Sequence, residues 1–184
     1  MRLNIVRIVF CLLGVAPAFG LEKKIDTVHS SLIVHVQKAG LLFAAGHEHT
    51  VAAPIEDGSI DDGNNPRVSF RVLTNAMTLL PEEHQAQVQR TMQEKVLESA
   101  RYSEIRFSSQ SVLPLGDGRW VVRGDLSLHG RTKTIRVEVT QHVDRYMGEA
   151  VIKQTDFGIQ PISVAGGTIR VKNELRISFI VVTD

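Results

Sequence analysis

The chain has 184 residues, of which 43% are hydrophobic and 22% are charged, and its formal net charge is +1. This length suggests a single domain. No basic run stands out along the chain, so nucleic acid and an anionic membrane surface are poor candidates for a partner.

The first 20 residues have the features of a secretory signal peptide, which is removed from the mature protein. Arg2 and Arg7 give a basic start, an apolar run covers residues 8–15, and residues 16–20 offer small side chains for cleavage. A membrane anchor is the alternative, but the apolar run is too short to span a bilayer. We therefore expect residues 21–184 to form one periplasmic or secreted domain.

Removal of the signal peptide leaves 19 basic and 20 acidic residues, a formal net charge of −1. It also removes Cys11, the only cysteine of the chain. The mature domain is therefore expected to have no disulfide, no zinc site built on thiolates and no cysteine nucleophile.

Two strands are expected near the start of the domain, over residues 25–37 and 41–53. Side chains alternate between the two faces of a strand. If the second strand is unbroken, His47 and His49 share a face with its apolar residues. Gly46 could host a bulge that breaks this alternation.

A third strand over residues 67–73 alternates apolar and polar side chains, and a helix follows between Pro81 and Glu98. Pro81 and the two acids after it suit a first helical turn. Apolar residues then recur at a spacing of four, which marks one helical face. These residues are Val88, Met92 and Val96.

Residues 120–140 read as an antiparallel hairpin, because the apolar positions are even before the turn and odd after it. We expect a two-residue loop at Gly130–Arg131 with a type II′ turn, which needs a positive φ at its first residue. This register pairs Leu126 with Ile135 and places opposite charges across from each other on the outer face, which stabilises a ladder.

Further strands are expected from residue 105, at residues 150–153 and from residue 169 to the end. About eight strands with one helix suggest a closed antiparallel barrel, with a sandwich as the alternative. An eight-stranded barrel has room for a filled core or for one small ligand. Aromatic residues make up only 5% of the chain, which favours a cavity.

Several segments resemble the YceI-like family. Residues 124–133 match its Gly-Asp-Leu-x-x-His-Gly-x-Thr-Lys run, and Tyr102 to Ser109 is similar to a second signature, with Ser103 in place of the usual proline. Matches to the opening and to a later segment of the family are Ile25-Asp26, His29-Ser30 and Phe157-Gly158-Ile159.

The resemblance covers essentially the whole mature chain. It implies an eight-stranded, lipocalin-like antiparallel barrel with one main helix, located in the periplasm. It also implies that the barrel binds a long isoprenoid or a similar amphiphilic lipid in its lumen. A membrane or a quinone enzyme is a transient partner that such a carrier could meet. No functional residue carries over from the family, because its cavity is apolar rather than built on a fixed catalytic set.

The apolar inward positions on separate strands are the residues we expect around the lipid tail. They are Phe70, Val72, Phe107, Leu126, Leu128 and Phe179. The headgroup is expected at the mouth of the barrel, where His47 or His49 could form a hydrogen bond with it. We expect no catalysis, because the chain has no Gly-x-Ser-x-Gly elbow, P-loop or dinucleotide fingerprint.

The stretch Gly46-His47-Glu48-His49 departs from the family pattern and leaves a second reading open. Two imidazoles two residues apart on a strand can hold one zinc, copper or nickel ion or a haem iron. Such a site needs at least one further ligand, from His29, His35, His129 or an acid. The alternative function is therefore a metal or haem protein in electron transfer or stress defence.

Overall fold

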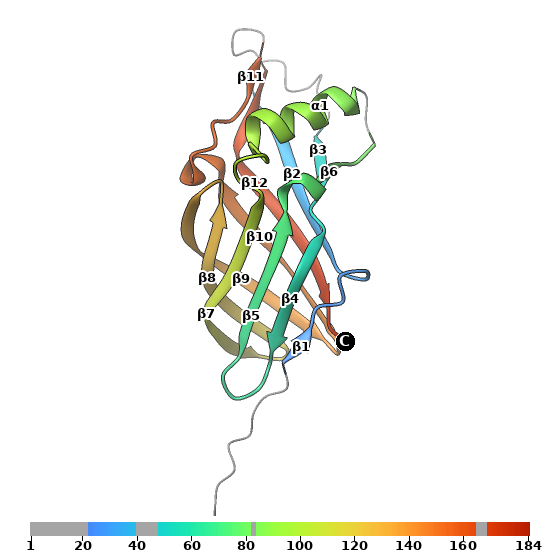
Figure 1. Cartoon of the computed structure of the whole chain (residues 1–184). Coiled ribbons are helices and arrows are strands. Elements are labelled where there is room, and N and C mark those ends of the chain that lie inside the picture. Colours follow the sequence, from blue (N-terminus) through green and yellow to red (C-terminus); the bar gives the residue numbers. More distant parts are fainter. Residues whose placement is uncertain (1–21, 40–47, 82–83, 165–168) are drawn as a thin grey trace, which may run out of the picture.

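A computed structural model describes residues 22–39, 48–81, 84–164 and 169–184. Within these ranges one antiparallel sheet forms an elongated half-barrel, and a helix lies across one end of it (Figure 1). The strands are β1 Lys23–Lys24, β2 Ser31–Ala39, β3 His49–Ala52, β4 Ile55–Asp61, β5 Arg67–Leu73, β6 Thr78–Leu79, β7 Glu104–Gly116, β8 Arg119–Leu128, β9 Arg131–His142, β10 Arg145–Lys153, β11 Ser163–Val164 and β12 Ile169–Val182. The helical segments are η2 Thr74–Ala76, α1 Gln85–Thr91, η3 Met92–Val96 and η4 Gln154–Phe157.

The predicted count of eight strands is wrong. The hydrogen-bonded path through the described residues has eleven strands, in the order β1-β4-β5-β7-β8-β9-β10-β12-β2-β3-β6, and β11 pairs with β12 beside it. Eight of these strands have seven residues or more, and the other four have only two to four. Pieces this short show no alternation of their own. β4 is longer, but it was not expected as a strand because Asp57-Gly58 reads as a turn.

The sheet is a half-barrel and not the continuous closed barrel that the sequence suggests. β3 and β4 follow each other around Pro54, but β3 pairs with β2 and β6 whereas β4 pairs with β1 and β5. At one end of the half-barrel, the start of the domain connects β4 to the end of β12. β1 pairs with Ser59 and Ile60 of β4, and Ile25 forms an isolated bridge with Thr183. We call this the β1 end, and the opposite one the helix end (Figure 1).

The register predicted for the hairpin of β8 and β9 is wrong by two residues. Gly124, not Leu126, lies opposite Ile135. The reason is the turn: His129 and Gly130 both have positive φ, 51° and 72°, which is a type I′ geometry. A shift of two residues keeps every side chain on its face, so the inward and outward positions stand as expected.

The predicted helix is present, but it begins at Gln85 rather than at Pro81. His84 before it has a left-handed φ of 57°, which separates the helix from Pro81. The helix continues from α1 into one π-type turn, closed by a hydrogen bond from Leu97 N to Met92 O of 2.9 Å. The described residues contain no helix long and apolar enough to cross a membrane.

Three glutamines spaced four apart hold the helix against the sheet. Gln85 Nε2 donates to Leu79 O at 2.9 Å, and Gln93 Nε2 donates to Met77 O at 2.9 Å. Gln89 makes two bonds: its Nε2 donates to Met77 O at 2.8 Å, and its Oε1 accepts from Leu79 N at 2.7 Å. Because β6 ends the strand path, these side chains cover the open edge of the sheet.

We predict that Gln89→Ala lowers the free energy of unfolding by about 2 kcal/mol, because it leaves the N–H of the buried Leu79 without its Gln89 acceptor and removes one of the two amide donors to the Met77 carbonyl. Urea unfolding would measure this. The control is Gln87→Ala on the exposed side of the same helix, expected within about 0.5 kcal/mol of the unchanged protein. Equal stability of the two variants would contradict the anchoring role.

Candidate functional site

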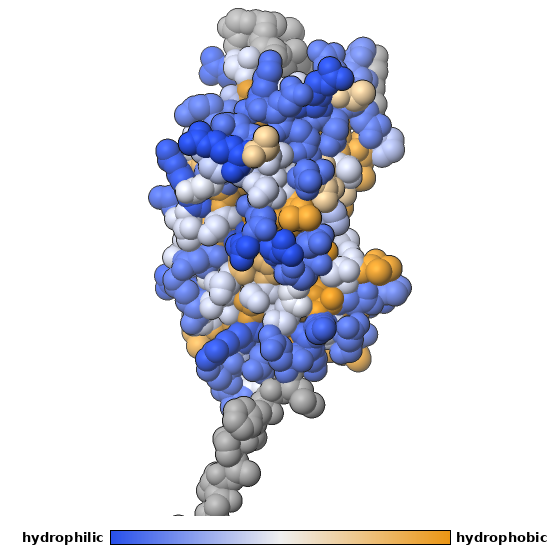
Figure 2. All heavy atoms as spheres, in the orientation of Figure 1, coloured by the Kyte–Doolittle hydropathy of each residue, from blue (hydrophilic) through white to orange (hydrophobic). Residues whose placement is uncertain are grey.

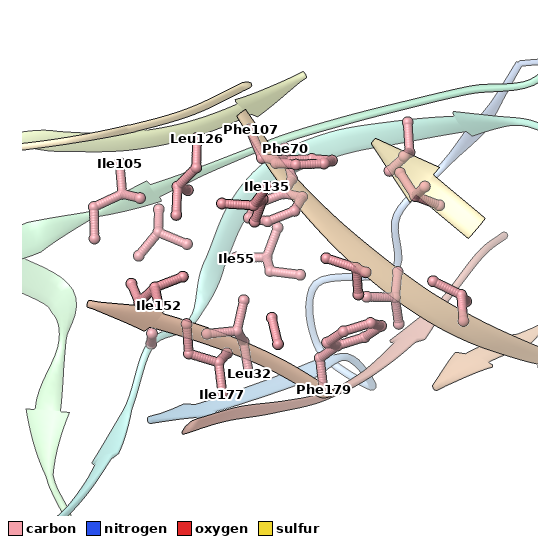
Figure 3. A pocket seen from close by; sticks show the side chains of 18 of the residues that line it. Leu32, Ile55, Phe70, Ile105, Phe107, Leu126, Ile135, Ile152, Ile177 and Phe179 are labelled. Carbon is pink, nitrogen blue, oxygen red and sulfur yellow. The ribbon is translucent and has the colours of Figure 1, made fainter. Parts of the chain in front are cut away.

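The inner face of the half-barrel encloses a cavity of about 220 Å³. All eight long strands contribute to its wall, and Val96 and Leu97 cover it at the helix end. The wall is apolar along its length, and Figure 3 shows side chains from several strands pointing toward one another across the space. Apolar cavities of this kind exclude water and accept apolar molecules.

The six apolar residues predicted around the ligand tail all line this cavity. They are Phe70, Val72, Phe107, Leu126, Leu128 and Phe179. They come from β5, β7, β8 and β12, so residues far apart in sequence meet on one inner surface. Phe70 and Phe107 stack with their ring centroids 5.4 Å apart, and Figure 3 shows the two rings side by side.

Two of the phenylalanines, Phe107 and Phe179, pack with their rings over a glycine of a nearby strand. A Cβ added to Gly124 would lie 2.5 Å from the Phe107 ring, and one added to Gly148 would lie 2.7 Å from the Phe179 ring. Glycine in these inward positions therefore makes room for the aromatic rings, in the way that aromatic side chains cover strand glycines in curved sheets.

A chain of hydrogen bonds crosses the β1 end of the cavity. Trp120 Nε1 donates to Gln141 Oε1 at 3.1 Å, and Gln141 Nε2 donates to the Tyr146 hydroxyl at 3.3 Å. The Tyr146 hydroxyl and Lys23 Nζ both donate to Asp62 Oδ2, at 3.1 and 2.8 Å. We call these five residues the floor; three of them, Trp120, Tyr146 and Asp62, line the cavity.

The floor is not apparent from the sequence, because Tyr146 lies between Asp144 and Gly148 in a stretch that reads as a turn. In the structure β10 already begins at Arg145. The pattern that could have predicted this strand is the alternation of inward residues at Tyr146, Gly148, Ala150 and Ile152. Gly148, which makes room for the Phe179 ring, made the stretch look like a turn instead.

The floor shifts the ionisation of two of its members. Burial raises the pKa of Tyr146 to about 12, and the hydrogen bond to Asp62 acts in the same direction. The Lys23 hydrogen bond lowers the pKa of the Asp62 carboxyl, partly opposed by burial and reinforced by the bond from Tyr146. Tyr146 is thus held as a neutral donor and Asp62 as an ionised acceptor.

The histidines are distributed over the molecule. His47 lies outside the described residues. His49 lies on β3 opposite Val36, two residues before the buried Val51 and so on the same sheet face. It is half-buried and is engaged in at least one interaction.

The three histidines considered as further metal ligands each have another partner. His29 Nδ1 is 2.5 Å from Asp26, His35 Nε2 is 3.0 Å from Ser178 Oγ, and His129 Nε2 is 3.0 Å from Glu98. Among the described residues, no group of three or more His, Cys, Asp or Glu is placed to hold a metal ion.

We predict that an ultraviolet absorbance titration shows a tyrosine phase centred near pH 12 and that Tyr146→Phe removes it, whereas Tyr102→Phe leaves it in place. Because the folded pKa of Tyr146 lies above its ordinary value of 10.0, its contribution to stability is complete below pH 10 and is lost as the pH rises toward 12. Loss of the late phase in Tyr102→Phe instead would contradict the assignment.

Comparison with known sequences gives a match over nearly the whole described chain. A sequence model of the YceI-like domain matches residues 24–183. UPF0312 proteins of Vibrio campbellii and Vibrio parahaemolyticus are each 32% identical over 116 residues, which is 62% of this chain and 59% of theirs. The match therefore spans less than two thirds of the length of these relatives.

Solved structures share the fold at low sequence identity. BcnA of Burkholderia cenocepacia superposes with a TM-score of 0.63 and 17% identity, covering 87% of this chain and 99% of that one. A polyisoprenoid binding domain from Saccharophagus degradans gives 0.63 and 15%, covering 90% and 98%. These structures show the shared fold, and the family match over residues 24–183 shows that the chain belongs to the YceI-like family.

Proposed function

We propose that this protein binds one elongated amphiphile, a long-chain isoprenoid or a similar lipid, inside the cavity and carries it in the periplasm. The observation that carries the proposal is the apolar wall that all eight long strands build around one space. The fold shared with a domain described as polyisoprenoid binding supports it. The proposed signal peptide, residues 1–20, supports secretion and lies outside the described residues.

Burial alone can hold such a ligand. Moving an alkyl chain from water to an apolar site releases roughly 0.8 kcal/mol per CH₂, so a long tail needs no strong polar contact. The cavity of about 220 Å³ is smaller than the ~300–1,000 Å³ typical of sites for drug-sized ligands. This size favours one slender chain over a bulky ring system, and the proposal contains no catalytic step.

The tail is proposed to lie along the six residues named above. Four of them are buried and together offer a contact surface shielded from water: Val72, Phe107, Leu126 and Leu128. His49 shares the inner-face parity of Val51 and is the described candidate for a hydrogen bond to the headgroup.

We predict that Leu126→Trp fills the cavity and lowers lipid occupancy at least tenfold while the sheet still folds. Leu126 is buried, lines the cavity and lies opposite Phe107 on β7, so a larger ring there takes the space of the tail. Native mass spectrometry of protein purified from lipid-containing extracts measures the occupancy, and circular dichroism confirms the fold.

The matched control is Arg123→Trp, which adds the same ring to the exposed outer face of the same strand. It should leave the occupancy unchanged. Unchanged occupancy in a folded Leu126→Trp protein would instead mean that the cavity is not the lipid site.

The alternative, a metal or haem protein that uses His47 and His49, makes an opposite prediction. It requires stoichiometric metal or a haem absorption band in the purified protein, and loss of both in the double variant His47→Ala/His49→Ala. The lipid proposal predicts a colourless protein without stoichiometric metal. Elemental analysis and a visible spectrum decide between the two, and metal retained by the double variant would refute this histidine pair as its ligands.

A further inference from the structure

The turn between β8 and β9 carries His129, a residue of the family signature to which the proposed function gives no role. This turn lies at the helix end, beside the segment that follows η3. His129 Nε2 is 3.0 Å from Glu98 Oε1, although the two residues are 31 positions apart in sequence. The His129 side chain is only 11% exposed. We call the Glu98–His129 pair the clasp, because it joins the end of the helical segment to a hairpin of the wall.

Tyr102 packs against the clasp from the segment before β7. Its ring centroid is 4.2 Å from that of His129, and Arg101 Cζ is 5.0 Å from the Tyr102 centroid. The same ring covers Gly130, where an added Cβ would approach it to 2.7 Å. The two sequence segments that resemble the family most closely, residues 102–109 and 124–133, therefore meet at the clasp.

Both residues of the clasp have a left-handed backbone, with φ of 47° at Glu98 and 51° at His129. This conformation is unfavourable for a residue with a side chain, and it persists only where the surroundings hold it. At Glu98 the surroundings are two groups of bonds. Its carbonyl accepts from Arg101 N and Tyr102 N at 2.8 and 2.9 Å, and its carboxylate is held by His129. The clasp therefore helps to maintain the strained backbone of Glu98.

The residue before Glu98 covers the cavity. Leu97 is 7% exposed and lines the cavity together with Val96. It follows the π-type turn of η3, a rare conformation that is often found at functional sites. Leu97 thus lies between two uncommon backbone conformations, one of which depends on the clasp. We call residues 92–98 the cover.

The attachment of the cover differs from that of the wall. Leu97 is the only buried residue of the cover, and no residue of α1 before it is buried. Gln93 holds the cover through hydrogen bonds of its Nε2 to Thr74 O and Met77 O, each 2.9 Å. Segments with few buried apolar contacts open locally at a lower cost than the whole fold. The cover belongs to no strand of the described chain, so its displacement breaks no strand ladder.

We propose that the cover is the gate through which a ligand enters and leaves the cavity, and that the clasp keeps this gate closed. When the clasp separates, Glu98 is released from its left-handed conformation and Leu97 moves away from the cavity with it. The inference rests on the proposed function and adds to it the place where the ligand passes and the contact that controls its passage.

The clasp is tested by two substitutions that suit the backbone and remove the contact. His129→Asn keeps the type I′ turn, because Asn followed by Gly is preferred there, but its side chain is too short to reach Glu98. Glu98→Asn removes the carboxylate, and Asn tolerates a left-handed φ. The control is His35→Asn, which removes a contact of 3.0 Å to Ser178 Oγ away from the clasp, between β2 and β12.

Amide hydrogen exchange, followed by mass spectrometry of peptides, measures opening without any ligand. We expect exchange over residues 92–102 to become at least fivefold faster in His129→Asn and in Glu98→Asn, with β10 and β12 unchanged. The double variant should match the single ones, because only one contact is lost. Unchanged exchange over residues 92–102, or an equal rise over the whole chain, would overturn the clasp.

The gate is tested with cis-parinaric acid, a fluorescent fatty acid, chased from the protein with excess stearate. Native mass spectrometry first establishes that one molecule loads per protein. We expect the two clasp variants to release the probe at least fivefold faster than the unchanged protein, and His35→Asn to release it at the unchanged rate. Circular dichroism checks the fold, and if His129→Asn fails to fold, Glu98→Asn decides.

The outcomes separate the gate from the proposed function. Faster release together with faster local exchange supports both. Unchanged release despite faster local exchange overturns the gate and leaves the proposed function standing. Failure of both cis-parinaric acid and stearate to load the unchanged protein overturns the proposed function, and the gate with it.

Discussion

The fold depends on one constraint: each long strand has one apolar face, and these faces can leave water only by curling around a common space. The curvature leaves that space incompletely filled. At about 24 cal/mol per Å³ of cavity, an empty volume of about 220 Å³ costs on the order of 5 kcal/mol. This is comparable with the whole stability of a small domain, about 5–15 kcal/mol. A ligand tail recovers the missing dispersion contacts, so binding and stability are coupled through the same apolar surface.

The two ends of the half-barrel are closed by different kinds of hydrogen bonds. At the β1 end, five side chains from separate segments form one chain of hydrogen bonds, and the ionised Asp62 accepts two of them. At the helix end, the glutamines of the helix bond backbone groups of Met77 and Leu79. The face of the outer surface seen in Figure 2 is mostly hydrophilic, with a few apolar residues among the polar ones. The hydrogen bonds that close the cavity therefore differ between its two ends.

The sequence predicted the inner face well because side-chain parity along a strand survives errors in pairing. The hairpin of β8 and β9 shows this: its register differs by two residues from the expected one, yet Leu126 and Leu128 still point inward. The register itself depended on positive φ at His129, which alternation does not encode. The observed pairing even places Arg123 opposite Arg136; Arg136 is compensated by Glu138 at 2.9 Å. Tyr146 was missed because its acceptor Asp62 is 84 positions away along the chain, beyond any local pattern.

The low identity to the superposed structures, 15–17%, follows from what the wall requires. An apolar wall needs residues of suitable size and inward parity, and cores tolerate many such exchanges when total volume is kept. The wall can therefore hold many apolar tails and distinguishes poorly among them, since one extra or missing methylene changes binding by only about 1–3 kcal/mol. Buried polar groups discriminate more strongly, because a wrong ligand leaves them unpaired. The polar residues that line the cavity lie toward its ends, Asp62 and Tyr146 at the β1 end and Gln154 toward the helix end, so stronger discrimination among ligands requires contacts there.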